Sequence, residues 1–329
     1  MRLTAAEVCA GGGGQALGLE TAGFDCVGAV EIDGSCCDTL RLNRPGWRVI
    51  QSDIREISGR DWRGVDLFAG GVPCPPFSIA GKQLGHLDDR DLFPEAIRIV
   101  EECKPSAVLL ENVPGFASAK FRGYRRRLAA ALSRLGYEVR WSALNASDYH
   151  VPQLRPRFII VGLRPRSAVR FVWPEPLSGR APTVGEAIGD LMASRGWPGA
   201  VAWAKRAAGI APTIVGGSKK HGGPDLGPTR ARRQWAALGV DGLGIADEPP
   251  GPSFPFAASP RLTARMVARL QGFPDSWKFT GKKTAAYRQV GNAFPPPVAA
   301  QVGLAIARAL EAGSAPQRRL QANLFEQNA

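Results

Sequence analysis

The stretch that decides the fold is Glu7-Val8-Cys9-Ala10-Gly11-Gly12-Gly13-Gly14-Gln15, near the start of the chain. It has the form of a strand, a glycine turn and the beginning of a helix. Because glycines carry no side chain, a ligand can approach this backbone closely, and the helix N-terminus favours negative charge. The stretch is typical of a nucleotide-like cofactor site, although a tight strand–helix turn without a ligand has the same pattern.

Two acidic residues support the cofactor interpretation. Glu31 ends the next apolar run, about 20 residues after the turn, where an acid suits the ribose hydroxyls of a nucleotide. Asp53 ends the third apolar run in the same way. On these residues alone, a nicotinamide cofactor is not excluded.

Strand and helix signals alternate through residues 1–165. The predicted strands are Ala5–Ala10, Cys26–Ile32, Trp47–Ser52, Val65–Ala69, Ala107–Leu110 and Phe158–Leu163. The predicted helices between them are Gln15–Gly23, Gly34–Asn43, Asp91–Cys103 and Tyr124–Gly136. This alternation predicts an α/β fold with a mainly parallel, doubly wound sheet, whose ligands sit beyond the carboxyl ends of the strands.

A second, smaller domain is predicted over residues 164–260. This part is rich in Pro and Gly and shows only short helical pieces such as Thr183–Met192. Helical patterns return at Thr263–Leu270 and Pro297–Leu310. We therefore expect residues 1–163 and 261–329 to form the larger domain.

Composition limits the classes of partner. Lys and Arg number 42 against 29 Asp and Glu, a net charge of +13, and this balance favours a polyanionic partner. No run approaches the roughly 18 apolar residues that span a bilayer, and no signal sequence is evident, so we expect a cytoplasmic protein without membrane contact. The six cysteines show no Cys-x-x-Cys spacing, so no metal site is expected.

Three further clusters lie at the ends of predicted strands and could carry chemistry: two follow a strand and the third begins one. Cys74 lies in a proline-stiffened loop, a good position for a nucleophile, although a buried inert thiol is the alternative. Glu111 follows an apolar strand, where its pKa can rise enough for proton donation, or it simply caps a turn. Arg155 and Arg157 alternate on one face and can clamp a phosphate or carbonyl, unless they are a solvated strand edge.

Taken together, these clusters resemble the cytosine-5 DNA methyltransferase family over nearly the whole chain. The matching motifs are Pro73-Cys74, Glu111-Asn112-Val113, Gln153-x-Arg155-x-Arg157, the glycine turn, Leu262-Thr263 with Arg269–Pro274, and Arg288-Gln289-Val290-Gly291-Asn292-Ala293. One departure is Cys9, where the family usually has Phe. The resemblance implies a Rossmann-like class I methyltransferase domain, with residues 164–260 as an irregular target-recognition domain.

The resemblance also implies a mechanism. The Cys74 thiolate would add to C6 of a cytosine flipped out of the duplex, while Glu111 protonates or hydrogen-bonds N3. Arg157 would orient the ring through its carbonyl oxygen, and Arg155 would support the nucleophile or nearby backbone. Methyl transfer to C5, loss of the C5 proton to an unassigned base and elimination of the cysteine would complete the reaction.

Carried over residue by residue, the resemblance assigns the binding sites. For S-adenosylmethionine, with S-adenosylhomocysteine as product, it assigns Cys9, Ala10, Gly11, Gly14, Glu31, Ile32, Asp53, Ile54, Gly71, Pro73, Leu92, Asn292 and Ala293. For DNA contacts the candidates are Ser78, Lys82, Gln153, Lys219, Lys220, Arg230, Arg232 and Arg233. The implied partner is double-stranded DNA with one recognition sequence, met by a monomer, and the presence of a cognate restriction endonuclease is left open.

Three alternatives stay open at this point. A relative with the same motifs methylates cytosine in transfer RNA, against which the long variable segment and basic charge favour DNA. A nicotinamide oxidoreductase would use the glycine turn but leaves the other motifs unexplained. A catalytically inactive DNA-binding protein of the same fold is disfavoured by the presence of Cys74, Glu111 and both arginines.

Overall fold

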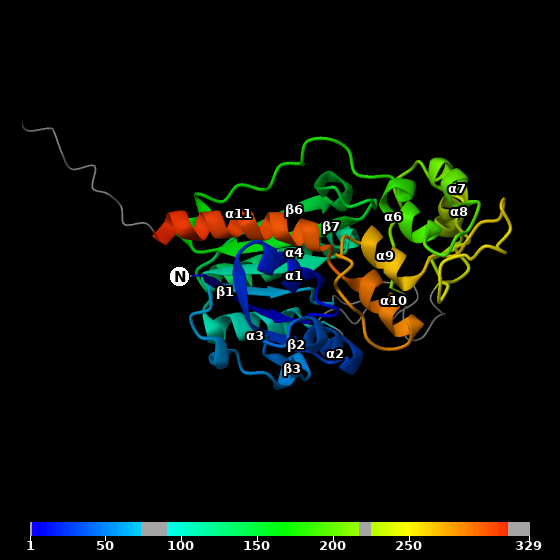
Figure 1. The fold of residues 1–329 in the computed structure, drawn as a ribbon. Helices are drawn as coiled ribbons and strands as arrows, with labels where there is room; N and C mark the ends of the chain where they lie inside the picture. The colour runs from blue at the N-terminus through cyan, green and yellow to red at the C-terminus, as the bar shows by residue number, and fades with distance from the viewer. Residues whose placement is uncertain (1, 74–90, 217–224, 315–329) are drawn as a thin grey trace, which may run out of the picture.

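The computed structural model describes residues 2–73, 91–216 and 225–314, and within them seven strands form one sheet. The strand order is β3-β2-β1-β4-β5-β7-β6 (Figure 1). The strands are β1 (Leu3–Val8), β2 (Phe24–Glu31), β3 (Val49–Gln51), β4 (Leu67–Gly70), β5 (Ala107–Asn112), β6 (Glu138–Asn145) and β7 (Pro156–Leu163). All neighbouring pairs from β3 to β5 are parallel, whereas β7 runs antiparallel between β5 and β6. The predicted mainly parallel sheet is confirmed.

Eleven α-helices lie in the described residues. They are α1 (Gly14–Thr21), α2 (Gly34–Asn43), α3 (Phe93–Cys103), α4 (Arg122–Arg134), α5 (Pro165–Ala168), α6 (Val184–Ala193), α7 (Ala200–Arg206), α8 (Thr229–Ala237), α9 (Ala264–Leu270), α10 (Lys283–Asn292) and α11 (Pro296–Ser314). Seven of them correspond to predicted helices, while α5, α7, α8 and α10 were not predicted, nor was strand β6.

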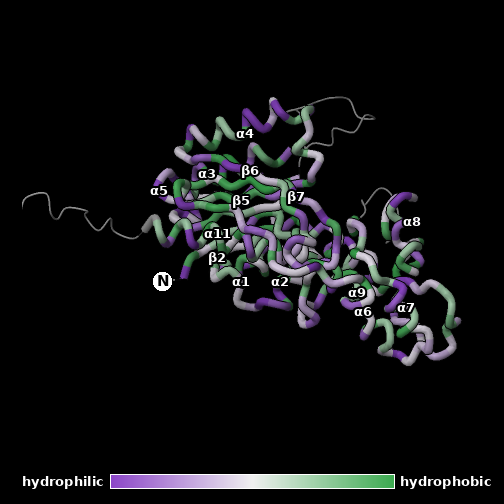
Figure 2. Tube along the Cα trace, turned by 90° about the horizontal axis from the view of Figure 1, so that it is seen from above, coloured by the Kyte–Doolittle hydropathy of each residue, from purple (hydrophilic) through white to green (hydrophobic). Residues whose placement is uncertain are grey.

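The sheet is covered on both faces because its strands are apolar on both faces. In β5, Ala107 and Leu109 belong to a core shared with α1 and α11, whereas Val108 and Leu110 belong to a core shared with α3 and α4. Figure 2 shows α3 and α4 on one side of the sheet and α11 on the other. Such double coverage is the usual environment of parallel strands. Because both faces are covered, a ligand site can form only at the ends of the strands.

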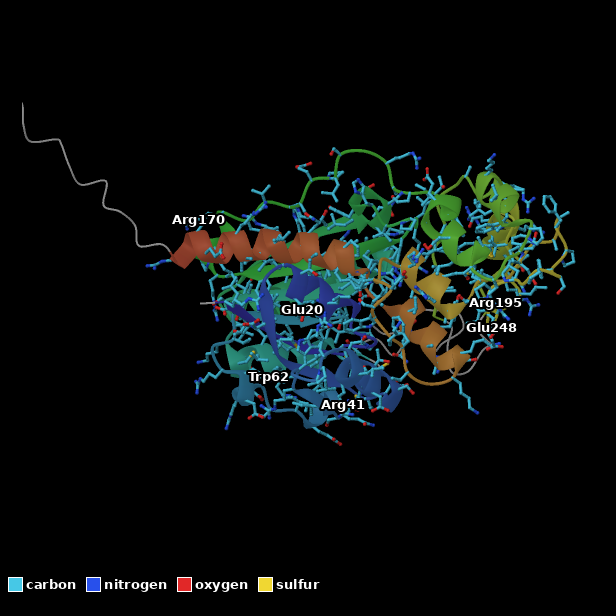
Figure 3. The ribbon with its side chains drawn as sticks, viewed as in Figure 1. Glu20, Arg41, Trp62, Arg170, Arg195 and Glu248 are labelled. Atoms are coloured by element: carbon cyan, nitrogen blue, oxygen red, sulfur yellow. The ribbon has the colours of Figure 1, made fainter. Side chains whose placement is uncertain are left out.

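A third hydrophobic core joins the smaller domain to the rest of the protein. It contains residues of α6 to α8, among them the fully buried Trp203 and Trp235, and also residues of α9 and α10. Arg195 and Glu248 form an ion pair on the surface of this domain (Figure 3). Next to the predicted boundary at residue 164, α5 and Phe171 still pack in the core of the sheet.

Candidate active site

The glycine turn brings the last part of the chain against the first strand. Gly13 has a φ of 87°, in the left-handed region that glycine adopts without steric cost. A Cβ on Gly14 would lie 2.3 Å from the backbone oxygen of Phe294, so only glycine fits there. Cys9 adopts a φ of 54° although it has a side chain. The turn therefore sits directly beneath the loop that follows α10.

A cavity of about 470 Å³ opens above this turn. Ten of the predicted cofactor residues line it, namely Cys9, Ala10, Gly11, Gly14, Glu31, Ile32, Gly71, Pro73, Asn292 and Ala293. The Ile32 side chain is 64% exposed, which offers an uncovered apolar surface on the cavity wall. Asp53, Ile54 and Leu92 do not line it: Asp53 pairs with Arg55 at 2.9 Å and Ile54 is buried.

Glu31 is held in place by the backbone of the turn. Its Oε2 accepts a hydrogen bond from the Gly11 amide at 2.8 Å, and its Oε1 accepts from the amides of Ile32 and Asp33 at 2.8 and 2.9 Å. A carboxylate has about four lone-pair sites, so this one can still accept hydroxyl groups. The geometry suits an acid that binds the hydroxyls of a ribose.

Three cavity residues that the sequence analysis did not assign have buried polar atoms without a partner among the described residues. These atoms are Glu7 Oε2, Gln15 Nε2 and Arg288 Nε, and all three residues line the cavity. Buried polar groups are normally satisfied, so orphaned atoms around a cavity indicate a missing polar ligand. One acceptor and two donors match the amino and carboxylate groups of an amino acid. With Glu31 and Ile32, the lining fits S-adenosylmethionine, which joins a nucleoside to methionine.

Glu7 is an unusual residue in this position, because it places a carboxyl group within the otherwise largely apolar strand β1. Burial raises the pKa of Glu7 well above its ordinary value, and the neighbouring Glu31 raises it further. Burial likewise raises the pKa of the Cys9 thiol to about 12, with Glu31 and Glu7 adding to the effect. Cys9 is thus a protonated, inert thiol at neutral pH.

A second cavity of about 780 Å³ adjoins the first and shares Gly71, Pro73, Glu111 and Asn292 with it. In it, Arg157 Nε lies 2.7 Å from Glu111 Oε1, with both side chains about nine-tenths buried. Burial raises the pKa of the Glu111 carboxyl, although the charges of Arg157 and Arg155 oppose the rise. Glu111 and Arg157 together offer a proton donor and a cation next to the cofactor cavity.

Arg155 lines this cavity as well, and its hydrogen bonds hold together segments that lie far apart in the sequence. Its side chain, 1% exposed, donates to the carbonyl oxygens of Ile214, of Gly291 at 2.6 Å and of Ala293 at 3.0 Å. Gln153 is completely buried beside it. Its amide donates to Gln271 Oε1 at 2.6 Å and accepts from the Ile214 amide at 2.8 Å. The structure therefore does not bring Gln153 to a surface that DNA could reach, because protein groups occupy its amide.

The remaining DNA candidates divide into two groups. Ser78, Lys82, Lys219 and Lys220 lie outside the described residues, as does the predicted nucleophile Cys74. On α8, Arg230 and Arg233 are exposed, while Arg232 is half-buried and donates to Thr229 Oγ1 at 3.3 Å. Trp235 anchors this helix in the core and leaves the two exposed arginines pointing to solvent.

Two negative findings apply to the described residues alone. In the ranges 2–73, 91–216 and 225–314, no three His, Cys, Asp or Glu side chains gather as metal ligands. None of the helices found in those ranges is both long enough and apolar enough to cross a bilayer.

Comparison with known proteins agrees with this geometry. The M.NaeI type II methyltransferase of Lentzea aerocolonigenes is 55% identical over 312 residues, which are 94% of this chain and 75% of that protein. M.NgoMIV of Neisseria gonorrhoeae is 52% identical over 314 residues, covering 94% of this chain and 99% of the relative. The crystal structure of Spodoptera frugiperda DNMT2 has a TM-score of 0.64 at 18% identity, over 93% of this chain and 99% of that one.

The fold likeness confirms the predicted Rossmann-like class I methyltransferase domain. The sequence pattern of the C-5 cytosine-specific DNA methylase family matches residues 3–210 and 252–308. This match covers most of the chain, and both relatives are named type II methyltransferases. These findings favour the predicted DNA methyltransferase over the transfer-RNA alternative. The chain belongs to the C-5 cytosine-specific DNA methylase family.

Proposed function

We propose that the protein methylates C5 of a flipped-out cytosine at one short recognition sequence in double-stranded DNA. The observation that carries this proposal is the sharing of Glu111 and Asn292 by two adjoining cavities, one suited to a nucleoside cofactor and one holding the Glu111–Arg157 pair. A methyl donor bound in the first cavity and a cytosine bound in the second would lie next to each other, on either side of the residues that the cavities share. Each cavity supplies the chemistry that the other lacks.

The first cavity would hold S-adenosylmethionine. Glu31 would bind its ribose, Ile32 would pack against its adenine, and Glu7, Gln15 and Arg288 would satisfy its amino-acid end. When bound, this cofactor supplies an electrophilic methyl group and leaves as S-adenosylhomocysteine. Asp53, Ile54 and Leu92 do not line this cavity and stay predicted contacts.

The second cavity would hold the cytosine and activate it. The thiolate of Cys74 would add to C6, while protonated Glu111 donates to N3, so that electron density accumulates at C5. Arg157 would donate to the ring carbonyl oxygen and keep Glu111 oriented through their 2.7 Å contact. Once C5 has formed its bond to the donated methyl group, the C5 proton leaves to a base, the sulfur–C6 bond breaks and Cys74 is released.

Covalent trapping tests this proposal. A duplex carrying 5-fluorocytosine blocks the loss of the C5 substituent, so the Cys74 adduct accumulates when S-adenosylmethionine is present. We expect a denaturation-resistant protein–DNA complex with wild-type protein and with Cys9→Ser. Cys74→Ser should form none. A stable complex with Cys74→Ser, or none with wild type on duplexes covering all short sites, would overturn the assignment.

The setting of the reaction follows from the same proposal. We propose that the protein acts as a monomer, because a single recognition domain attached to a single catalytic domain suits an asymmetric DNA site. The names of both relatives support a role beside a cognate restriction endonuclease. Work on chromosomal DNA would place the protein in the cytoplasm at the nucleoid.

A further inference from the structure

An uninterrupted basic segment follows the strand that carries Glu111. From Asn112 to Tyr137 the chain contains no Asp or Glu, yet it contains Lys120, Arg122, Arg125, Arg126, Arg127 and Arg134. The segment forms two short turns of 3-10 helix, Pro114–Ala117 and Ala119–Phe121, and then α4. The first turns of α4 are strongly hydrophilic (Figure 2).

The beginning of this segment forms a wall of the cavity that holds Glu111 and Arg157. Val113, Pro114, Phe116 and Phe121 line that cavity. Phe116 and Phe121 are buried and contact each other with ring centroids 5.2 Å apart. The residues on either side of Phe121 are thereby held at the rim of the proposed base pocket.

Two of the arginines have structural partners. Arg125 donates to the carbonyl oxygens of Phe116 and of Ser118, the latter at 2.9 Å, and so ties the 3-10 turns to α4. The Arg127 guanidinium lies 5.5 Å from the ring centroid of Tyr124. These contacts fix the backbone on which the remaining basic side chains stand.

The other three basic residues at this end, Lys120, Arg122 and Arg126, are exposed, and we name them the α4 cluster. None forms an ion pair with a carboxylate in the described part of the chain. Arg122 and Arg126 are four positions apart on one helix face, an arrangement in which like charges repel. Three cations without a carboxylate partner in the described chain, two of them flanking the cavity residue Phe121, suit a polyanion that neutralises them.

We propose that the α4 cluster binds phosphates of the DNA backbone beside the target cytosine, on the large-domain side of the duplex. This inference rests on the proposed function and adds contacts outside the target-recognition domain. Phosphate contacts fix the register of the protein on the duplex and carry no sequence information. The α4 cluster would thus hold the duplex against the pocket while the smaller domain reads bases.

The salt dependence of duplex binding tests the proposal. The variant is the triple substitution Lys120→Gln, Arg122→Gln and Arg126→Gln. Each lost phosphate contact lowers the slope of log Kd against log salt by about 0.9, so the triple variant should lose about 2 to 3 units of slope. Its affinity should fall at least about tenfold, equally for target and non-target duplexes.

The matched control removes the same charge elsewhere, through Arg60→Gln, Arg63→Gln and Arg134→Gln. These residues are exposed, and they lie near the amino ends of the parallel strands, at the opposite edge of the sheet. We expect a salt slope within about 0.5 of wild type, because long-range charge alone is screened. Circular dichroism and cofactor affinity should be unchanged in both triple variants.

The outcomes separate the two proposals. Wild-type protein that binds no duplex overturns the proposed function. Wild-type protein that binds duplex, with both triple variants keeping its salt slope, overturns the α4 cluster alone. Equal losses of slope in the two triple variants also overturn it, since that would show an effect of net charge. A loss confined to single-stranded RNA would assign the surface to a different polymer.

Discussion

Gly216 packs so closely on Asn292 that a Cβ at Gly216 would lie 2.1 Å from Asn292 Oδ1. The contact is reciprocal along the backbone, since a Cβ on Gly291 would lie 2.5 Å from the Gly216 Cα. Asn292 lines both cavities, and Gly216, which lies within residues 164–260 of the smaller domain, lines the second one. The proposed recognition domain and the cofactor cavity thus share one tightly packed junction.

Gly216→Ala should weaken cofactor binding without unfolding the protein. The added methyl group must displace the Asn292 side chain, so we expect Kd for S-adenosylmethionine to rise about tenfold, or about 1.4 kcal/mol. Isothermal titration calorimetry measures this directly. Gly251→Ala is the control, because a Cβ there meets nothing within 4 Å. Equal affinities in the two variants would show that the junction does not position Asn292.

Arg155→Lys should destabilise the protein markedly. A lysine cannot reach the carbonyls of Ile214, Gly291 and Ala293 together, and buried acceptors without donors are costly. We expect the free energy of unfolding in urea to fall by about 2 to 4 kcal/mol. The exposed Arg230→Lys should change it by less than about 0.5 kcal/mol. If Arg155→Lys is equally mild, the arginine does not hold the junction.

Glu111→Gln should separate catalysis from binding. The amide preserves the shape of the side chain but cannot deliver a proton, so kcat should fall about 100-fold or more. Affinities for DNA and S-adenosylmethionine should stay within about twofold, because the amide keeps the shape of the side chain at the wall that the two cavities share. The exposed Glu101→Gln on α3 serves as the control for kcat. A Glu111→Gln variant with wild-type kcat would remove Glu111 from the mechanism.

Glu7 should make the stability of the protein depend on pH. Because its folded pKa lies above the ordinary value of 4.5, the folded state binds the extra proton. The stabilising contribution is complete below that ordinary value and is lost as pH rises through the folded pKa. Glu7→Gln cannot titrate, so its stability relative to wild type should increase over that window. Parallel urea titrations from pH 4 to 9 measure the difference, and a constant difference would contradict a raised pKa.

Much of the fold is predictable from the sequence because buried parallel strands are continuous apolar runs. The six predicted strands all exist, and the proposed catalytic residues of the described chain lie in or next to them: Glu111 in β5, Arg157 in β7 and Arg155 directly before β7. Strand β6 was missed because it is an edge strand whose residues, such as Arg140 and Trp141, remain partly exposed. Helix α10 was missed because Arg288–Ala293 was interpreted as a family motif and no secondary structure was predicted for it.

Site residues were predictable where their chemical type indicates a role, and less predictable where tertiary packing determines whether a side chain is accessible. Glu111 and Arg157 meet as their motifs suggest. Gln153, in contrast, was predicted to contact DNA because it is a polar residue next to two arginines. Only the tertiary structure shows that its side chain is completely buried. Glu7 was overlooked although a charge within an apolar strand is a usable signal.

The most direct test of the account is methylation of plasmid DNA. Purified protein is incubated with S-adenosylmethionine and unmethylated plasmid, and methylcytosine is mapped by bisulfite sequencing, with Cys74→Ala as the control. We predict methylation of one cytosine within one short recurring sequence, absent from the Cys74→Ala sample. Unmethylated plasmid with wild-type protein, or equal methylation with Cys74→Ala, would contradict the account.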